Sequence, residues 1–286
     1  MIEPFLVAAL VAGGAAVLKL LLSSSGREQD EAWKLAARRV QGELELAPGT
    51  WLKSATRAIF LEVRGVALAI DAYEDHDGET RVEYTRVSSG ALPGASGIAL
   101  VVSPRGLLRK LSKGLGIGES PTGDDDFDAA IHVSATPRGI AGVFLDRAMR
   151  AVVVQADMKL EIEDGRLRIV VRGHPESAEP LVAMTRFAER IVERWTSLTR
   201  GATRVAERLG LVCEADVDLV EKRVFARGLH RGHATSMTLV VDDDGGRTLV
   251  TCEGLDEIAF DGLEPDPEEV VAALASAVDA RTDGYR

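Results

Sequence analysis

The sequence predicts an α+β protein: one N-terminal transmembrane helix followed by antiparallel hairpins packed with a long helix and several shorter helices. Three observations predict this class. An uncharged apolar run lies near the N-terminus, apolar and polar residues alternate on both sides of Asp-Gly turns, and longer segments repeat apolar residues at spacings of three and four. The 286 residues are 46% hydrophobic and 28% charged, which is typical of a globular chain.

These patterns divide the chain into four parts. They are a transmembrane anchor over residues 1–22, a juxtamembrane hinge and amphipathic helix over 23–49, the main α+β domain over 50–210, and a small C-terminal α+β unit over 211–286.

The predicted anchor is the apolar run of residues 2–22. No charged residue lies between Phe5 and Leu18, and the whole run has about the 20 residues that cross a bilayer. Lys19 lies near one end, where its long side chain reaches the headgroups. A cleaved signal peptide is one alternative, but residues 1–4 contain no lysine or arginine. A buried core helix is the other.

Flanking charges predict the orientation of the anchor. Its N-terminal side carries Glu3 and no basic side chain, whereas its C-terminal side carries Lys19, Arg27, Lys34, Arg38 and Arg39. The positive-inside rule therefore predicts a single-pass protein of the bacterial inner membrane with its soluble domain in the cytoplasm. Cys213 and Cys252 fit a reducing compartment as free thiols, although two cysteines could also pair in an oxidising one.

Periodicity predicts the elements of the main domain in order. Helical spacing predicts an amphipathic helix over residues 28–46, which Pro48-Gly49 ends. Alternation predicts a hairpin over 57–87 with its turn at 75–78. The later elements are a strand at 98–102, helix 105–115, strand 129–133, helix 142–154, hairpin 158–171 around Asp164-Gly165, and a long helix 180–209 closed by Gly210. The long helix is predicted to bury Leu181, Met184, Phe187, Ile191, Trp195 and Leu198.

The C-terminal unit repeats this pattern on a smaller scale. Strands at 237–241 and 248–252 flank an Asp- and Gly-rich turn, and Asp266-Pro267 begins a final helix. Arg64-Gly65 and Arg231-Gly232 each precede a hairpin, and gapless alignment also matches the acidic turns that follow. A duplication and independent use of the same turn chemistry both explain this similarity.

Composition and motifs exclude several kinds of chemistry. With 34 basic and 45 acidic residues the formal charge is −11, which argues against a general nucleic-acid binder. Two cysteines exclude a disulfide-stapled scaffold and a four-cysteine zinc module. His230 and His233 alone make no zinc site, and the acidic clusters lack the spacing of an EF-hand. The sequence predicts no catalytic, cofactor-binding or metal-ligating residues and no cofactor.

One basic stripe is a candidate surface for anionic lipid. Arg105, Arg109 and Lys113 are four residues apart on the predicted helix, and Lys110 lies beside them. Near a bilayer each such residue contributes about 1 kcal/mol of attraction to anionic headgroups. A solvated helix face is the alternative interpretation.

A Gly-Asp-x-x-Phe-Asp segment at residues 123–128 is followed by a strand, a helix and a Glu-Asp-Gly-Arg-Leu hairpin at residues 163–167. This order resembles a module of uncharacterised bacterial membrane-anchored proteins and covers roughly residues 51–209. The resemblance implies a short membrane region before a soluble α+β part, and it implies no catalytic residues. Proteins of that kind commonly have two membrane helices, whereas this chain shows one.

Three functional hypotheses follow. The leading one is a non-enzymatic membrane-anchored protein that contacts the bilayer through residues 2–22 and binds or scaffolds a protein partner, with no nucleic acid. The second is a membrane-tethered hydrolase with a site assembled from distant residues: His132, His174, Asp128 and Asp146. The third is an anionic-lipid sensor that uses the stripe of Arg105, Arg109, Lys110 and Lys113.

Overall fold

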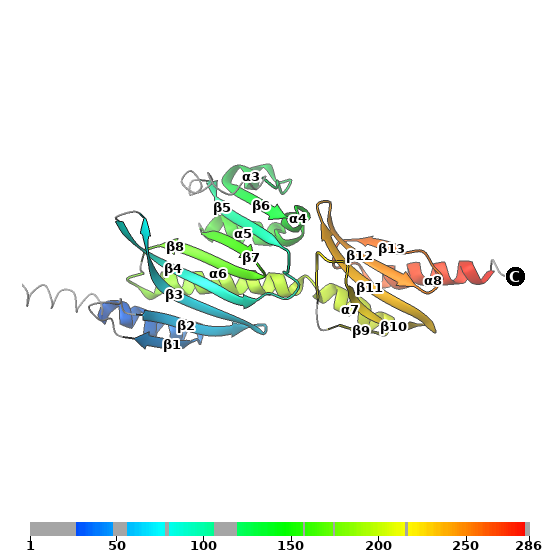
Figure 1. Cartoon of the computed structure of the whole chain (residues 1–286), viewed down its shortest axis with the longest axis horizontal. Helices are drawn as coiled ribbons and strands as arrows, with labels where there is room; N and C mark the ends of the chain where they lie inside the picture. The colour runs from blue at the N-terminus through cyan, green and yellow to red at the C-terminus, as the bar shows by residue number, and fades with distance from the viewer. Residues whose placement is uncertain are drawn as a thin grey trace, which may run out of the picture. The chain divides into compact units, whose positions relative to one another are not determined.

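A computed structural model of the chain describes residues 27–47, 56–77, 80–105, 119–156, 158–173, 175–214 and 217–283 (Figure 1). The predicted anchor, residues 2–22, lies outside these ranges. Across the ranges that are described, no helix is both long enough and apolar enough to span a membrane.

The predicted α+β class is confirmed, and the described residues form two antiparallel sheets. The eight-stranded sheet has the order β1-β2-β3-β4-β8-β7-β5-β6, and the five-stranded sheet has the order β13-β12-β11-β10-β9 (Figure 1). The strands of the first sheet are β1 Glu43–Ala47, β2 Thr56–Val63, β3 Val66–Asp77, β4 Thr80–Ala91, β5 Ala99–Pro104, β6 Ile131–Thr136, β7 Lys159–Glu163 and β8 Arg166–Arg172. Those of the second are β9 Leu211–Cys213, β10 Val224–His230, β11 His233–Asp242, β12 Gly245–Cys252 and β13 Ile258–Asp261.

Helices complete the two units into which the chain divides. One helix covers residues 27–40, and the others are α3 Asp125–Ala130, α4 Gly139–Phe144, α5 Arg147–Ala156, α6 Ala178–Ser197, α7 Arg200–Leu209 and α8 Pro267–Asp283. The first unit comprises Met1–Leu61, Ala69–Arg86 and Arg172–Arg186, and the second comprises Glu62–Leu68, Val87–Val171 and Phe187–Arg286. The domain boundaries expected from the sequence stay predictions.

In the first unit, the helix after the anchor is shorter than predicted. It ends at residue 40, and the next residue, Gln41, has a left-handed φ of 56°. A Cβ on Gly42 would lie 2.6 Å from the side chain of Ile59, so the chain passes close against β2 at this point. Residues 43–47 then pair with β2 as strand β1, and the expected helix 28–46 is wrong over that stretch.

A partly buried ion pair joins this helix to β2. The Arg57 guanidinium is 2.8 Å from the Asp30 carboxylate, and the Arg57 side chain is only 8% exposed. Trp33, Ala36 and Ala37 of the same helix are also buried. Of the apolar residues that helical spacing places on one face of this helix, Ala32, Ala36 and Val40 are buried, whereas Leu35 is 41% exposed. The predicted C-terminal end of the helix is wrong.

The predicted hairpin 57–87 is a meander of three strands. Arg64 and Gly65 have φ of 52° and 80°, which is the left-handed pair of a two-residue hairpin turn, and they join β2 to β3. β3 continues to Asp77, so the expected turn at 75–78 begins too early. Arg231 and Gly232 form an equivalent turn between β10 and β11, with φ of 52° and 85°. After these turns, β3 has 12 residues and β11 has 10. The acidic residues that follow therefore take different positions in the two hairpins, and the acidic turns are not structurally equivalent.

In the second unit, the hairpin predicted at 158–171 is confirmed as β7 and β8. Its turn residues Asp164 and Gly165 have φ of 49° and 71°. The strand predicted at 98–102 is β5, but the strand predicted at 129–133 begins only at Ile131. The preceding residues form α3, because the Asp124 side chain accepts a hydrogen bond from the Phe127 amide and caps the helix.

Two of the predicted helices are interrupted. The helix expected at 142–154 is α4 followed by α5, and the Asp146 carboxylate between them accepts a 2.8 Å hydrogen bond from the Met149 amide. The helix expected at 180–209 bends between α6 and α7, and Gly210 closes it with a φ of 74°, as predicted. The predicted apolar face is confirmed as buried: Leu181, Met184, Phe187, Ile191, Trp195 and Leu198.

The five-stranded sheet contains both predicted strands, as β11 and β12, and also β9, β10 and β13, which were not predicted. Thr235, Met237, Leu239 and Val241 alternate as buried residues along β11. α7 contacts β9, β10 and α8, while α4 contacts β11 and β12. The predicted start of α8 is confirmed, because Asp266 accepts a 2.9 Å hydrogen bond from the Glu268 amide.

Candidate functional site

The candidate lipid-contact residues are only partly described. Arg109, Lys110 and Lys113 lie outside the described ranges. Arg105 donates a 2.8 Å hydrogen bond to the Asp128 carbonyl and pairs with the Glu119 carboxylate. Its guanidinium thus already has protein partners.

The residues of the hydrolase hypothesis have separate partners. Asp128 accepts hydrogen bonds from the amide and the hydroxyl of Thr122, at 2.9 to 3.1 Å. Asp146 caps α5 and lies 3.2 Å from the Arg194 guanidinium. His174 lies outside the described residues, and among those described no hydrogen bond or ion pair joins His132 to Asp128 or Asp146.

The structure places other polar groups next to His132. Its Nδ1 is 3.7 Å from the Glu119 carboxylate, and Ser103 of β5 lies directly opposite it in the register of β5 and β6. The Ser103 side chain is buried, and its hydroxyl has no hydrogen-bond partner among the residues that the structure describes. Sequence reasoning missed Ser103 and Glu119, because no motif links them to His132 along the chain.

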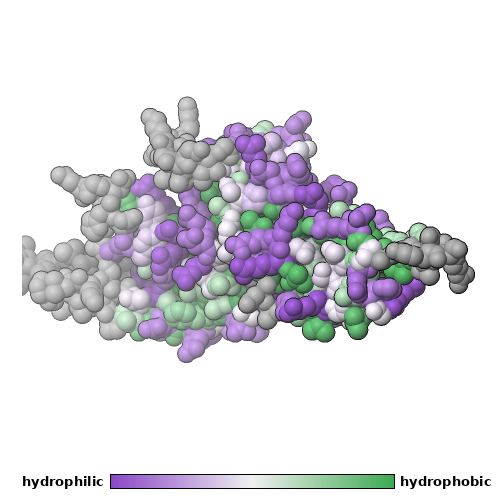
Figure 2. All heavy atoms as spheres, turned by 45° about the vertical axis from the view of Figure 1, so that its right-hand side comes forward, coloured by the Kyte–Doolittle hydropathy of each residue, from purple (hydrophilic) through white to green (hydrophobic). Residues whose placement is uncertain are grey.

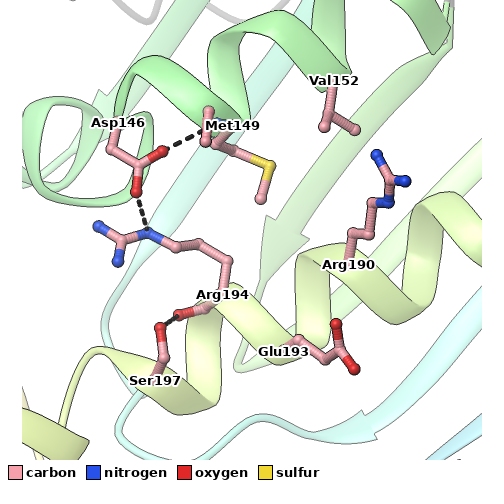
Figure 3. Close-up of a pocket in the computed structure, with 8 residues that line it drawn as sticks. Asp146, Met149, Val152, Arg190, Glu193, Arg194 and Ser197 are labelled. Atoms are coloured by element: carbon pink, nitrogen blue, oxygen red, sulfur yellow. Dashed lines mark hydrogen bonds and ion pairs between the residues drawn. The ribbon is translucent and has the colours of Figure 1, made fainter.

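A groove with convergent polar groups lies between α5 and α6 (Figure 3). It encloses about 370 Å³, within the range of small ligand sites. One wall is formed by Ala148, Met149 and Val152 of α5, and the other by Arg190, Glu193, Arg194 and Ser197 of α6, with Asp146 at one end.

Arg194 is held rigidly at that end of the groove. Its guanidinium donates hydrogen bonds to the carbonyls of Val143 and Phe144, at 2.6 and 3.3 Å, and pairs with Asp146. The Ser197 hydroxyl donates a 2.7 Å hydrogen bond to the Arg194 carbonyl one turn earlier (Figure 3). These contacts join α6 to the end of α4 and the start of α5.

Arg190 and Glu193 differ in direction. In Figure 3 the Arg190 side chain extends from α6 toward Val152 of α5, whereas the Glu193 carboxylate extends away from α5. Both residues are exposed. Within the described part of the chain, Arg190 has no ion pair or hydrogen bond from its side chain.

A second groove runs along the other side of α5. It encloses about 420 Å³ between α3 and α5. Its lining residues are Asp124, Asp126, Phe127, Ala130, Arg147, Arg150, Ala151, Val154 and Gln155. Arg150 lies 3.3 Å from Asp124, so this pair is neutralised.

α5 therefore forms a ridge between two grooves. Its outward residues are Arg147, Ala148, Ala151, Val154 and Gln155. Val154 is 49% exposed, and the helix contains two arginines and no acidic residue. We call this ridge and its two grooves the α5 surface.

The five-stranded sheet carries the other notable apolar exposure in the second unit. Val212 is 73% and Leu229 66% exposed, and the register of β9 and β10 places them on the same face. Figure 2 shows apolar and hydrophilic residues interspersed over the surface that comes forward there. No concave site accompanies these two side chains among the described grooves.

Metal and thiol chemistry have little support among the described residues. They contain no group of three or more His, Cys, Asp or Glu that could hold a metal ion. His230 and His233 face each other across the Arg231-Gly232 turn, and His230 Nδ1 is 3.3 Å from the Leu209 carbonyl. Partial burial and the nearby Glu207 carboxylate raise the pKa of the Cys213 thiol, which favours the less nucleophilic protonated form.

Comparison of the chain with protein-family models, with curated proteins and with solved structures finds no match. The resemblance to bacterial membrane-anchored proteins with a Gly-Asp-x-x-Phe-Asp module therefore stays a prediction.

Proposed function

We propose that this protein is anchored in a membrane by residues 2–22 and binds a protein partner through the α5 surface, without catalysis. The observation that carries the proposal is the ridge of α5, where Ala148, Ala151 and Val154 are exposed between two grooves. The bacterial inner membrane and a cytoplasmic soluble domain are part of the proposal, on the strength of the flanking charges.

The shape and chemistry of the α5 surface support a protein partner. Amphipathic helices bind in apolar grooves through side chains spaced one turn apart, and a ridge with grooves on both sides offers such contacts. Ala148 and Ala151 are small, so a partner backbone can approach α5 closely. The polar residues at the edges match the polar rim that surrounds the apolar centre of protein interfaces.

Site-specific crosslinking tests this proposal. We expect p-benzoylphenylalanine in place of Ala151, in the full chain in native membranes, to give a discrete adduct with a partner. Val154→Asp should abolish the adduct, because a carboxylate on the ridge would have to be desolvated. Adduct formation is read on immunoblots after irradiation.

A matched control uses the other exposed apolar site. The same crosslinker in place of Val212, which is 73% exposed on the five-stranded sheet, should give no discrete adduct. Equal adducts at both positions, or none at position 151, would contradict partner binding through the α5 surface.

The hydrolase hypothesis has one specific observation in its favour. Ser103, His132 and Glu119 provide the residue types of a nucleophile, a base and a group that orients the base, although Ser103 is buried and forms no hydrogen bond to His132. If this set were active, a fluorophosphonate probe should label the protein, as the Ser103 oxygen bonds to phosphorus and fluoride leaves. Ser103→Ala should abolish labelling and Ser197→Ala should not. Absence of labelling in the natural chain would eliminate the hypothesis.

A further inference from the structure

The groove between α5 and α6 contains an unneutralised cation beside an apolar wall. Arg194 is paired with Asp146 and with two carbonyls, so its charge is compensated. The Arg190 side chain reaches toward Val152 with no partner of its own within the described residues (Figure 3). Met149 and Val152 supply the apolar contact next to it.

Most of the negative formal charge of the chain belongs to a segment that does not line this groove. Residues 211–286 contain 17 acidic and 7 basic residues, a net charge of −10, so almost all of the formal charge of −11 belongs to that segment. The groove is built from residues 146–197, which precede it. Among the residues that line the groove, Arg190 is the cation whose side chain has no partner within the described residues.

We infer that the α5–α6 groove binds an acidic amphipathic segment of a partner protein, an inference that rests on the proposed function. An apolar side chain of that segment packs on Met149 and Val152, and a carboxylate of the same segment accepts hydrogen bonds from the Arg190 guanidinium. Arginine forms planar, bidentate hydrogen bonds with carboxylates, which fix the direction of the bound segment.

A carboxylate fits this groove better than a phosphate or a lipid headgroup. A phosphate carries more charge and more acceptor oxygens, and its sites usually combine several cations or backbone amides. This groove is lined by one arginine without a described partner and also by the carboxylates of Asp146 and Glu193. A groove with one such arginine and an apolar wall therefore suits a segment that carries a single negative charge next to apolar side chains.

Two designed helical peptides provide the test. Both carry leucines at positions i, i+3, i+4 and i+7, and one has glutamates at the flanking positions where the other has lysines. Each is labelled with a fluorophore and titrated with the detergent-solubilised full chain, with binding followed by anisotropy. We expect the acidic peptide to bind at least about tenfold more tightly than the basic one, and less tightly as salt increases.

Charge reversal at Arg190 tests whether this residue causes the preference for the acidic peptide. Arg190→Glu should weaken binding of the acidic peptide about tenfold or more, whereas Arg190→Lys should retain most of it. Arg204→Glu is the matched control, since Arg204 is an exposed arginine of α7 outside the groove and loses the same charge. All three substitutions are at the surface, and circular dichroism verifies that the variants are folded.

The outcomes separate this inference from the proposed function. Equal affinity for the two peptides would contradict the inference that the groove binds an acidic segment. Equal effects of Arg190→Glu and Arg204→Glu would contradict it too. Absence of binding by either peptide would overturn it as well. Crosslinking from position 151 would still support the α5 surface as a docking site in each of those cases, and its absence would remove both.

Discussion

Replacing Trp195 by alanine is expected to lower the free energy of unfolding by about 3–5 kcal/mol, the usual cost of removing a buried aromatic side chain. Trp195 lies on α6 and is 1% exposed. Its ring centroid is 5.5 Å from that of Phe144, and its indole N–H donates a 2.8 Å hydrogen bond to the Pro93 carbonyl. The substitution therefore leaves a cavity and also an unpaired carbonyl.

Urea denaturation followed by circular dichroism measures this loss. Trp195→Phe retains a ring in the cavity but not the hydrogen bond, so it should cost less than alanine. Val154→Ala, on the exposed ridge of α5, should change stability by no more than about 0.5 kcal/mol. A loss of less than about 1 kcal/mol in Trp195→Ala would show that this residue is not part of the core that joins α6 to α4.

The same residue illustrates what periodicity can predict. Trp195 belongs to the face of α6 that repeats apolar residues at spacings of three and four, and every residue predicted on that face is buried. The hairpin at residues 158–171 was equally predictable, since Asp164-Gly165 has the residue types that tolerate a left-handed turn. Both features depend on residues that are close along the chain.

Element ends were less predictable, because they depend on distant contacts. Nothing local ends the first helix as strongly as Pro48-Gly49, yet the chain turns at Gln41 and Gly42 to pair with β2. The break between α4 and α5 is also tertiary: Asp146 caps α5 and simultaneously pairs with Arg194 from α6. A sequence window around residue 146 contains Asp146 but not Arg194, so local sequence cannot predict this ion pair.

The candidate sites, like the element ends, depend on contacts between residues that are distant in sequence. The predicted lipid stripe depends on spacing along one predicted helix, and Arg105, its one described member, forms contacts with Asp128 and Glu119. The α5–α6 groove combines residues that are some forty positions apart in sequence, including Met149 and Arg190. Local spacing carries no signal for such a groove, so it emerged only from the packing of α5 against α6.

The contact between α4 and the turn of β11 and β12 leads to the second large prediction. A Cβ on Gly139 would overlap the Asp242 carbonyl oxygen and lie 2.5 Å from the Gly245 nitrogen. The neighbouring Arg138 amide donates a 2.8 Å hydrogen bond to the Asp243 carboxylate. Gly139→Ala must therefore displace backbone at this contact, and we expect a loss of about 3 kcal/mol, at the upper end of the usual cost of overpacking.

Gly142 provides a control in the same helix, with the opposite expected sign. A Cβ at Gly142 would meet no atom within 4 Å, and alanine is the better helix former by about 1 kcal/mol. Gly142→Ala should therefore raise the midpoint of thermal unfolding while Gly139→Ala lowers it. The two substitutions add the same methyl group to one short helix, so an opposite sign would reflect mainly what each methyl group meets. Equal midpoints would mean that α4 does not pack against the turn of β11 and β12 in solution.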